Sequence, residues 1–562
     1  TGSILVQGGG SGVEAGAREF TPVDAGLFET PVRRAGVSGG TAPFFGLRLR
    51  DPCPPPGGAP ADRWIGKDLA RAIDELAFYE RARRLGISHG PAPGLEGILE
   101  FMLDYAGVVE CPAEGDKAGT PPKQLLVLEN LRAGRAHLRM LDIKIGEKTA
   151  AAGWQGKSRL KAFRQRIMDG FTNSQCEGFR LEGFEGPPPA LASADPLLDM
   201  RLEGSGAMHR KAFRVMLQRM PAADMLMHFL DLRCAPGAGL GGPPPAGAAA
   251  SERLSPAELA ELALREALRQ LARLALACRR VPAPQKWVGS SVAIALDAQL
   301  PLRDTPEVDV RRSVQLRLFD WGRSELNTRE RHEGLAPGER RDRAHFWCLY
   351  VHGIDRLAWE AARLYRNRFA SGEWQHVHVV VEDFDSMSAS DFIGLARVQL
   401  EPTAETTVPL LTRAGLPVRG RDGPATLTYA VALHELPAHA ALAGAWRVTL
   451  LRASGLPVRD CLQGTSDPYA SLVAVSRDGP RFRQETCVVK RNLNPEWRET
   501  FELPLARRGP RLLAEALEEA AEGLGGGELA PLFPPAHDAA GARRADARAL
   551  AAWRARLDGA GR

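Results

Sequence analysis

The chain has 562 residues, more than one ordinary domain contains, and 44% of them are hydrophobic, enough to bury more than one core. The formal net charge of +5 is spread along the sequence, so we expect no nucleic-acid partner, and anionic small molecules or anionic lipid fit better. No apolar run approaches the roughly 20 residues that span a bilayer, so no transmembrane segment is expected.

Cysteine usage points to a reducing compartment. The eight cysteines lie singly between Cys53 and Cys487, with no C-x-x-C pair and no dense framework. Neither disulfides nor a structural zinc site is therefore expected. The predicted location is the cytoplasm or the nucleus.

The first part of the chain alternates between low-complexity tracts and segments with regular apolar spacing. Residues 1–27 are predicted to be a disordered N-terminal fragment. Tracts rich in proline, glycine and alanine cannot bury enough surface to order themselves, and we interpret them as surface loops. These tracts are 54–60, 186–192 and 235–250. Helical spacing of apolar residues predicts helices at 68–85, 255–279 and 346–369.

From Trp374 onward the apolar period changes to two. Val377, Val379 and Val381 alternate with other side chains, and short strands follow between turns. Two β-rich segments are predicted, at 374–435 and 445–505. Beyond about residue 510 the composition collapses to alanine, glutamate, arginine and glycine, so 510–562 is expected to be a low-complexity tail.

The most informative stretch runs from Leu141 to Lys148 (LDIKIGEK). A buried strand rarely carries an aspartate and a lysine among aliphatic residues, and strand alternation puts Asp142 and Lys144 on one face. A carboxylate and an ammonium held on that face suit phosphoryl transfer, in which positioned charge does most of the catalysis.

Four further segments accompany this stretch in a fixed order. An apolar strand ends in an acidic, polar pair (LLVLENL), a basic helix precedes a G-x-R-x-x-G strand, and two shorter elements follow (WVGSSV and LRLFDWGRS). In chain order these segments are 125–131, 154–186, 287–292 and 316–324. Together with the D-x-K-x-G spacing at 142–146, the set resembles the inositol polyphosphate kinases over about residues 28–369.

The resemblance implies an α+β domain of two lobes, similar to protein kinases and ATP-grasp enzymes, that spans 28–370 and uses ATP and Mg²⁺. It implies that Glu129 and Leu131 meet the adenine. It also implies that Asp142 faces the ribose and the transfer site, and that Lys144 bridges the γ-phosphate and the acceptor. Asp320, with the hydroxyl of Ser291 nearby, would bind Mg²⁺, a hard cation that takes oxygen ligands.

The cation that grips the ATP phosphates is less evident. The family has a lysine on an N-terminal strand, whereas the strand predicted at 44–50 supplies Arg48 and Arg50, and Lys67 is an alternative. Glu75 would be the partner carboxylate, since it stands three residues before Phe78-Tyr79, as in the family's E-x-x-F-Y helix.

An anionic acceptor needs a cluster of cations beyond the D-x-K strand. On a helix, Lys157, Lys161 and Arg164 would share one face, at i, i+4 and i+7. There they would hold phosphates through charge-assisted hydrogen bonds, so these three are the predicted substrate-binding residues. The sequence departs from the family at Leu138, where a proline is expected, and at Trp321.

The β-rich region from Trp374 onward contains the two halves of one domain motif in separate segments. Residues 446–505 include GLPVRDCLQGTSDPYASL and resemble the first half of a C2 domain, whereas 374–410 resemble the second half. The resemblance implies five calcium-binding carboxylates: Asp383, Asp385, Asp391, Asp460 and Asp467. Clustered aspartates would repel one another without a cation, so Ca²⁺ is their natural partner.

Two arrangements explain the order of the halves. Either they assemble into one circularly permuted all-β sandwich, or each is a remnant of a separate repeat. We favour the sandwich, because an isolated four-stranded half would leave strand edges and an apolar face exposed. Such a module would bind anionic membrane lipids once Ca²⁺ neutralises its loops.

The sequence thus predicts an ATP- and Mg²⁺-dependent inositol polyphosphate kinase, recruited peripherally to membranes, that transfers the γ-phosphate to a hydroxyl or a phosphate of an inositol phosphate. The alternative is a catalytically weak, kinase-like scaffold that binds inositol phosphates or phosphoinositides. The two hypotheses differ in whether the predicted catalytic residues converge on one cleft with a phosphate-gripping cation.

Overall fold

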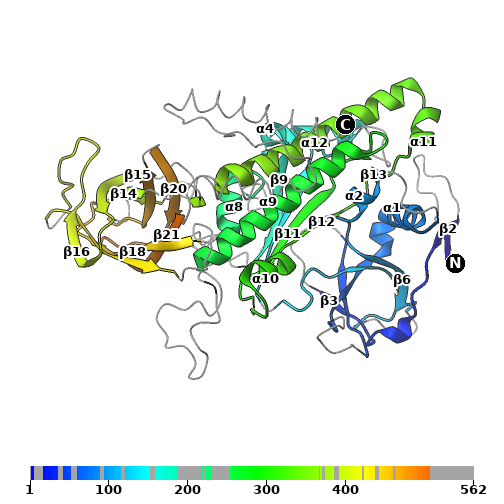
Figure 1. The fold of residues 1–562 in the computed structure, drawn as a ribbon, viewed down its shortest axis with the longest axis horizontal. Coiled ribbons are helices and arrows are strands. Elements are labelled where there is room, and N and C mark those ends of the chain that lie inside the picture. Colours follow the sequence, from blue (N-terminus) through cyan, green and yellow to red (C-terminus); the bar gives the residue numbers. More distant parts are fainter. Residues whose placement is uncertain are drawn as a thin grey trace.

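The computed structural model places two α+β lobes beside a β sandwich (Figure 1). The described residues are 2–5, 17–35, 42–51, 60–88, 94–115, 120–135, 137–151, 159–170, 172–186, 217–220, 222–230, 254, 256–300, 302–365, 368–369, 374–384, 391–420, 423–436, 442–459, 464–476 and 479–506. The predicted tail 510–562 and nearly all of the three low-complexity tracts lie outside them.

The first lobe is a five-stranded antiparallel sheet with strand order β3-β4-β5-β7-β6, and a long helix, α1, follows directly from β5. The bounds are β3 Arg33–Ala35, β4 Phe44–Leu47, β5 Trp64–Asp68, α1 Leu69–Ser88, α2 Glu96–Leu99, β6 Tyr105–Cys111 and β7 Lys123–Glu129. The helix predicted at 68–85 is confirmed. The apolar strand predicted upstream of the D-x-K stretch is β7, a central member of this sheet.

The segment before residue 28 is not disordered throughout, contrary to the prediction. It contains β1 (Gly2–Leu5), which pairs with β2 (Ala17–Phe20), and a 3₁₀ turn, η1 (Ala25–Leu27). The backbone N–H of Thr21 donates to Glu80 (2.8 Å), and the N–H of Val23 donates to the Val108 carbonyl (2.8 Å). These partners come from α1 and β6, so composition alone does not reveal them.

The second lobe is a four-stranded antiparallel sheet with strand order β12-β11-β8-β9, packed against the long helices α9 and α12. Its strands and helices are β8 Leu138–Ile145, α3 Arg159–Gly170, α4 Ser174–Glu177, β9 Phe179–Glu185, α8 Ala222–Leu230, α9 Pro256–Arg280, β10 Lys286–Trp287, β11 Ser291–Asp297, α10 Pro306–Ser313, β12 Gln315–Phe319, β13 Ser324–Glu325, α11 Arg329–Gly334 and α12 Pro337–Tyr365. The helix predicted at 346–369 starts nine residues earlier, since its first turns are charged and show no apolar spacing.

A glycine contact fixes α12 behind the end of β8. A Cβ added at Gly353 would lie 2.3 Å from the carbonyl oxygen of Gly178 and 3.0 Å from Ile145. That same carbonyl accepts the N–H of Gly146, the glycine of the D-x-K-x-G spacing (2.8 Å). Close approach of α12 therefore supports the strand that carries Asp142 and Lys144.

Replacing Gly353 with alanine is expected to destabilise the protein by about 1–3 kcal/mol, because the added methyl group overpacks this contact. Gly338, in the first turn of α12, has no atom within 4 Å of an added Cβ and provides a matched control. Gly338→Ala should change stability by less than about 1 kcal/mol. Denaturant unfolding of both variants checks this, and equal effects would contradict it.

The β-rich region forms a sandwich of two four-stranded sheets, ordered β15-β14-β19-β20 and β16-β17-β18-β21. The strands are β14 Trp374–Asp383, β15 Asp391–Gln399, β16 Thr403–Pro409, β17 Thr426–Glu435, β18 Leu442–Ser454, β19 Pro468–Ser476, β20 Gly479–Glu485 and β21 Glu496–Ala506. In the first sheet β14, from the earlier segment, pairs along its length with β19, from the later one. The two segments therefore build one sandwich, as predicted.

The sandwich has a single core to which both segments contribute. Val377, Val379 and Val381 are fully buried in it, together with Phe501 and Leu503 from the later segment. Trp374 also joins the two, since its indole N–H donates to the carbonyl of Pro504 (2.8 Å). Among the helices described here, none has the length and apolar character needed to cross a bilayer.

Candidate active site

A cavity of about 460 Å³ lies between the two lobes, next to the chain that connects β7 to β8. Strands β4 and β5 and helix α1 line it from the first lobe, and β8, β11 and the end of β12 line it from the second. Three of the predicted site residues on the second lobe, Asp142, Lys144 and Asp320, contribute to its wall. The D-x-K strand therefore faces a cleft rather than solvent.

Lys67 is a buried cation that the first lobe contributes to the cleft. It lies near the end of β5 with 9% of its surface exposed, and its ammonium pairs with the carboxylate of Glu75 on α1. The ammonium is also 4.0 Å from the carboxylate of Asp320 in the second lobe. The pair Lys67–Glu75 thus fixes a buried positive charge opposite Asp320.

Asp320 connects the two lysines of the cleft. Its carboxylate accepts a hydrogen bond from Lys144 (2.7 Å) on its second oxygen, and its first oxygen faces Lys67. The residue follows β12 directly and has a left-handed backbone, with φ +67°, a conformation that is uncommon for residues other than glycine and that clusters at functional sites.

Trp321 holds this strained residue in place. The indole is fully buried and stacks on Phe78 of α1, with ring centroids 4.2 Å apart, while Trp287 meets it edge-on. The departure from the family at Trp321 is thus accommodated by packing between the lobes. The other departure, Leu138, lies at the start of β8 and does not line the cleft.

The charges of the cleft reinforce one another. Burial would raise the pKa of the Asp320 carboxyl, but Lys144 and Lys67 outweigh it and hold the pKa at about 2. Burial would likewise lower the pKa of Lys67, but the carboxylates of Glu75 and Asp320 raise it overall. Both groups therefore keep their charges throughout the neutral range.

The lowered pKa of Asp320 sets a pH dependence of stability. Because the folded pKa of about 2 lies below the ordinary 3.8, the stabilising contribution is complete above pH 3.8 and is lost as the pH falls through 2. The difference in unfolding free energy between the wild type and Asp320→Asn should be constant from about pH 5 to 8 and shrink below about pH 4. Urea denaturation at several pH values measures it, and a difference that changes between pH 5 and 8 would contradict the assignment.

The inner end of the cavity has an apolar lining suited to a flat heterocycle. Ile65, Leu103, Leu128, Leu131 and Met140 line it beside the connection between the lobes. The predicted adenine contacts, Glu129 and Leu131, both belong to this wall. The Glu129 carboxylate accepts a hydrogen bond from Arg317 (2.9 Å), and the backbone N–H of Glu129 donates to the carbonyl of Asp104 (2.9 Å).

Ser291 lies at the start of β11, directly between two strands of the site. It pairs in register with Lys144 of β8 on one side and with Phe319 of β12, the residue before Asp320, on the other. Its hydroxyl is buried and has no hydrogen-bond partner among the described residues. A buried hydroxyl without a protein partner is able to ligate a hard cation, although Ser291 is not among the residues that line the cavity.

Two of the three candidate phosphate-gripping cations lie elsewhere. Arg48 pairs with Glu29 (3.4 Å) and Arg50 donates to the carbonyl of Phe28 (2.7 Å); both are exposed and neither lines the cavity. Lys67 is the candidate that faces the cleft. The predicted strand 44–50 is also shorter, ending at Leu47.

The predicted substrate-binding residues lie on or before α3. Lys157 is outside the described residues, as is the side chain of Lys161, and Arg164 is exposed on α3 without lining the cavity. Cations that the sequence interpretation missed do line it: Arg71, Arg132 and Arg323. Arg323 had a signal, since it follows Asp320 by three residues in LRLFDWGRS.

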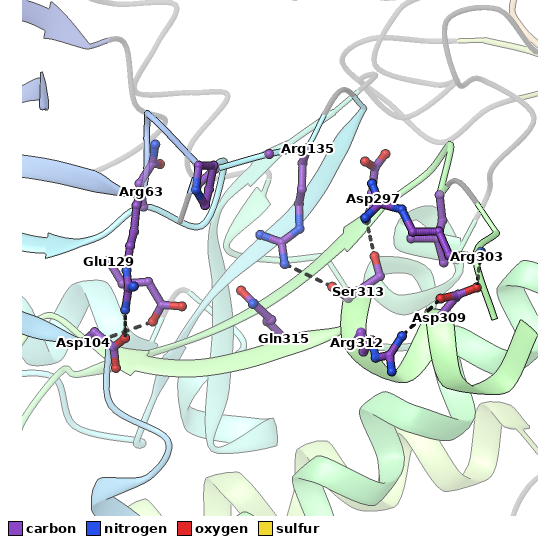
Figure 2. Close-up of a pocket in the computed structure, with 15 residues that line it drawn as sticks. Arg63, Asp104, Glu129, Arg135, Asp297, Arg303, Asp309, Arg312, Ser313 and Gln315 are labelled. Carbon is purple, nitrogen blue, oxygen red and sulfur yellow. Dashed lines mark hydrogen bonds and ion pairs between the residues drawn. The ribbon is translucent and has the colours of Figure 1, made fainter. Parts of the chain in front are cut away.

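A second cavity, of about 480 Å³, borders the same connection between the lobes (Figure 2). Its charges are mostly paired within its own wall, as with Arg63 and Asp104 (3.3 Å) or Arg312 and Asp309 (3.7 Å). Arg135 donates to the carbonyl of Ser313 (3.1 Å) in the same wall. Because the lysine–aspartate cluster lies in the first cavity, the candidate active site is assigned there.

The candidate calcium site lies where the two halves of the sandwich meet. Asp383, at the end of β14, accepts the N–H of Asp467 (2.5 Å), and it is the register partner of Asp391 on β15. Asp385 and Asp460 lie outside the described residues. Among the residues that are described, no three His, Cys, Asp or Glu side chains are arranged to hold a metal ion.

The solved structures to which the chain is similar include the inositol phosphate multikinase Ipk2 of S. cerevisiae, in complex with ADP and Mn²⁺. The match has 18% identity and a TM-score of 0.33 and covers 53% of this chain and 98% of that one. A second structure, described as an inositol phosphate multikinase, matches at 16% identity and a TM-score of 0.27, over 50% of this chain and 97% of that one. Scores this low carry no argument about the cleft.

The β sandwich has clearer relatives. Residues 365–411 and 444–518 match the family model described as the C2 domain. Over 60 residues the chain is 47% identical to Synaptotagmin-3 of Arabidopsis thaliana, a match that spans 11% of this chain and only 11% of that protein. The sandwich built by residues 374–506 therefore matches the C2 domain in both of its halves.

Proposed function

We propose that the two-lobed domain is an ATP- and Mg²⁺-dependent inositol polyphosphate kinase, which transfers the γ-phosphate of ATP to a hydroxyl or a phosphate of an inositol phosphate. The observation that carries the proposal is the convergence of Lys67, Asp142, Lys144 and Asp320 on one cleft. The sequence motifs that resemble the inositol polyphosphate kinases support the choice of acceptor.

The residues present fit ATP and a hard cation. The apolar slot beside Leu131 would accept adenine, and Lys67, held by Glu75, would bind phosphate oxygens. The carboxylate of Asp320 and the hydroxyl of Ser291 offer the oxygen ligands that Mg²⁺ takes. When bound, the metal supplies positive charge to the phosphate oxygens.

The chain's own part in transfer is electrostatic positioning. Lys144 lies on the wall of the cleft shared with Asp142, and its ammonium would stabilise the negative charge on the transferred group as the acceptor approaches. Asp142, two residues before it on the same strand face, would orient the ribose and the acceptor oxygen. The cationic side chains of Arg71 and Arg323 line the cleft where an anionic acceptor would enter.

The test is ATP consumption by the purified chain with a panel of inositol phosphates and Mg²⁺, with Lys144→Ala in parallel. Turnover with at least one acceptor, lost in the variant, supports the proposal. Tight binding of inositol phosphates with no turnover for any of them would reject the kinase and favour the scaffold.

We further propose that the C2 domain binds Ca²⁺ and anionic membrane lipid, which would recruit the kinase peripherally to membranes. The carboxylate of Asp383 accepts the backbone N–H of Asp467, and Asp391 is the register neighbour of Asp383, so aspartates of both halves lie at one edge of the sandwich. Together with Asp385 and Asp460, these aspartates are expected to bind a divalent cation that bridges the domain to lipid headgroups.

Asp391→Asn is expected to lower Ca²⁺-dependent binding to phosphatidylserine vesicles by about tenfold or more, because one anionic ligand is lost while an exposed side chain is changed. The control is Glu401→Gln, also exposed, which follows the far end of β15. Vesicle sedimentation with Ca²⁺ and with chelator measures the effect. Wild-type binding that does not respond to Ca²⁺ would contradict the proposal.

A further inference from the structure

Among its described side chains, helix α3 is attached to the second lobe through one face. Ala162 and Asp169 are buried on that face, and Gln165 donates to the carboxylate of Asp169 (3.0 Å). Asp169 in turn accepts the N–H of Thr149 and the guanidinium of Arg180, both at 2.9 Å. The C-terminal half of the helix is thereby fixed to β9 and to the loop that follows β8.

The opposite face of α3 is apolar and open. Leu160, Phe163 and Ile167 are 59%, 60% and 45% exposed, among the largest exposures of big apolar side chains in the described chain. Their spacing of i, i+3 and i+7 places them within about 60° of one another around the helix. They form one stripe, which we call the α3 stripe, directed away from the buried face.

Arginines border the α3 stripe on both sides. Arg164 lies on one flank and Arg159 and Arg166 lie on the other, and all three are exposed. The only acidic residue of the helix is Asp169, which is buried in the attachment to the lobe. No carboxylate among the described residues forms an ion pair with the three arginines.

We propose that the α3 stripe docks on an anionic lipid bilayer, with the three apolar side chains in the acyl boundary and the arginines on the headgroup phosphates. The arrangement of an apolar centre with cations on both flanks is that of a helix lying in a membrane interface. A stable protein partner would need a contact of about 800 Å² on this side, which three side chains on one convex helix do not supply. A bilayer adapts to a narrow ridge and meets both arginine flanks at once.

Docking would also bring the cleft close to the membrane. The loop residue that anchors α3, Thr149, accepts a hydrogen bond on its carbonyl from Arg323 (2.6 Å), which lines the cleft. The helix and the wall of the cleft are therefore mechanically linked through one residue. The inference does not depend on the proposed kinase activity, since binding to lipid requires no turnover.

The test uses the full chain with chelator present, so that the C2 domain contributes no Ca²⁺-dependent binding. The triple variant Leu160→Ser, Phe163→Ser, Ile167→Ser is compared with the wild type on phosphatidylcholine vesicles with and without phosphatidylserine. We expect at least about a tenfold loss of affinity for the anionic vesicles, since the apolar surface that enters the lipid is removed. Leu27→Ser, an exposed leucine in the first lobe (51%), is the matched control and should change nothing.

Hydrogen exchange gives a second measurement that does not rely on a variant. Amides of residues 159–170 in the wild type should exchange more slowly when anionic vesicles are added. Equal vesicle affinity of the triple variant and the wild type, with unchanged exchange in α3, would overturn the proposal. It would also be overturned if the triple substitution dissociated an oligomer of the free chain, because the stripe would then be a contact between two copies.

Discussion

Replacing Asp320 by asparagine is expected to lower the rate of phosphoryl transfer by about a thousandfold. The carboxylate faces two ammonium groups, Lys144 at 2.7 Å and Lys67 at 4.0 Å, and a neutral amide can neither balance them nor offer an anionic oxygen to Mg²⁺. Asparagine has nearly the same shape as aspartate, so the lower rate would result from the lost charge rather than from altered packing. Steady-state ATP consumption with the preferred inositol phosphate measures it.

Asp304→Asn is the matched control for this experiment. Asp304 is an exposed aspartate of the same lobe, paired with Arg312 at 2.6 Å, and it does not line the cleft. It should keep wild-type turnover. If Asp320→Asn stayed within a few fold of the wild type while its fold was intact, Asp320 would not be the metal-binding carboxylate, and the assignment of the cleft would fail.

The sequence was most informative where chemistry and periodicity coincide within one strand. Asp142 and Lys144 are two positions apart, so strand alternation alone puts them on one face, and the structure places both on the wall of the cleft. The helix that bears Glu75 and the apolar strand that ends at Glu129 were likewise evident from local spacing. Each of these predictions needed no knowledge of the neighbouring strands.

By contrast, identifying the cation that binds the ATP phosphates required knowledge of which strands are neighbours in the sheet. Arg48 and Arg50 follow β4, whereas Lys67 lies on β5, which is flanked by β4 and β7 and leads directly into α1. Strand order is a long-range property, so the sequence left three candidates. A local signal did exist, because Lys67 and Glu75 are only eight positions apart, and that spacing joins the end of a strand to the second turn of the helix that follows it.

The assembly of the sandwich was predictable for a different reason. Each segment alone has strands with one apolar face, as the alternation at Val377 and Val379 shows, and such a face must be covered. The apolar face of each segment is covered by the other segment, because β14 pairs with β19 and the two segments share one core. What the sequence did not reveal is the open face of α3, since burial of a helix face depends on what packs against it.

Replacing Arg180, on β9 of the second lobe, by methionine is expected to destabilise the two-lobed domain by about 3–5 kcal/mol. Arg180 donates to Asp169 (2.9 Å), Ser174 (2.9 Å) and Glu182 (3.1 Å), and both of these carboxylates have side chains only 5% exposed. Methionine fills similar space but removes a cation that two buried carboxylates share. Denaturant unfolding of the full chain measures the loss.

Two comparisons separate this charge effect from packing. Arg312→Met removes an arginine whose nearest carboxylate, Asp304, is more than half exposed. Its second carboxylate, Asp309 at 3.7 Å, keeps two backbone N–H donors, so the change should cost less than about 1 kcal/mol. In the double variant Arg180→Met, Asp169→Asn, one of the stranded charges is removed as well, so part of the stability should return. A single Arg180→Met variant as stable as Arg312→Met would show that the buried network does not hold α3 to the lobe. In that case α3 would not be anchored beside the cleft, and lipid docking through its stripe would not bring the cleft to the membrane.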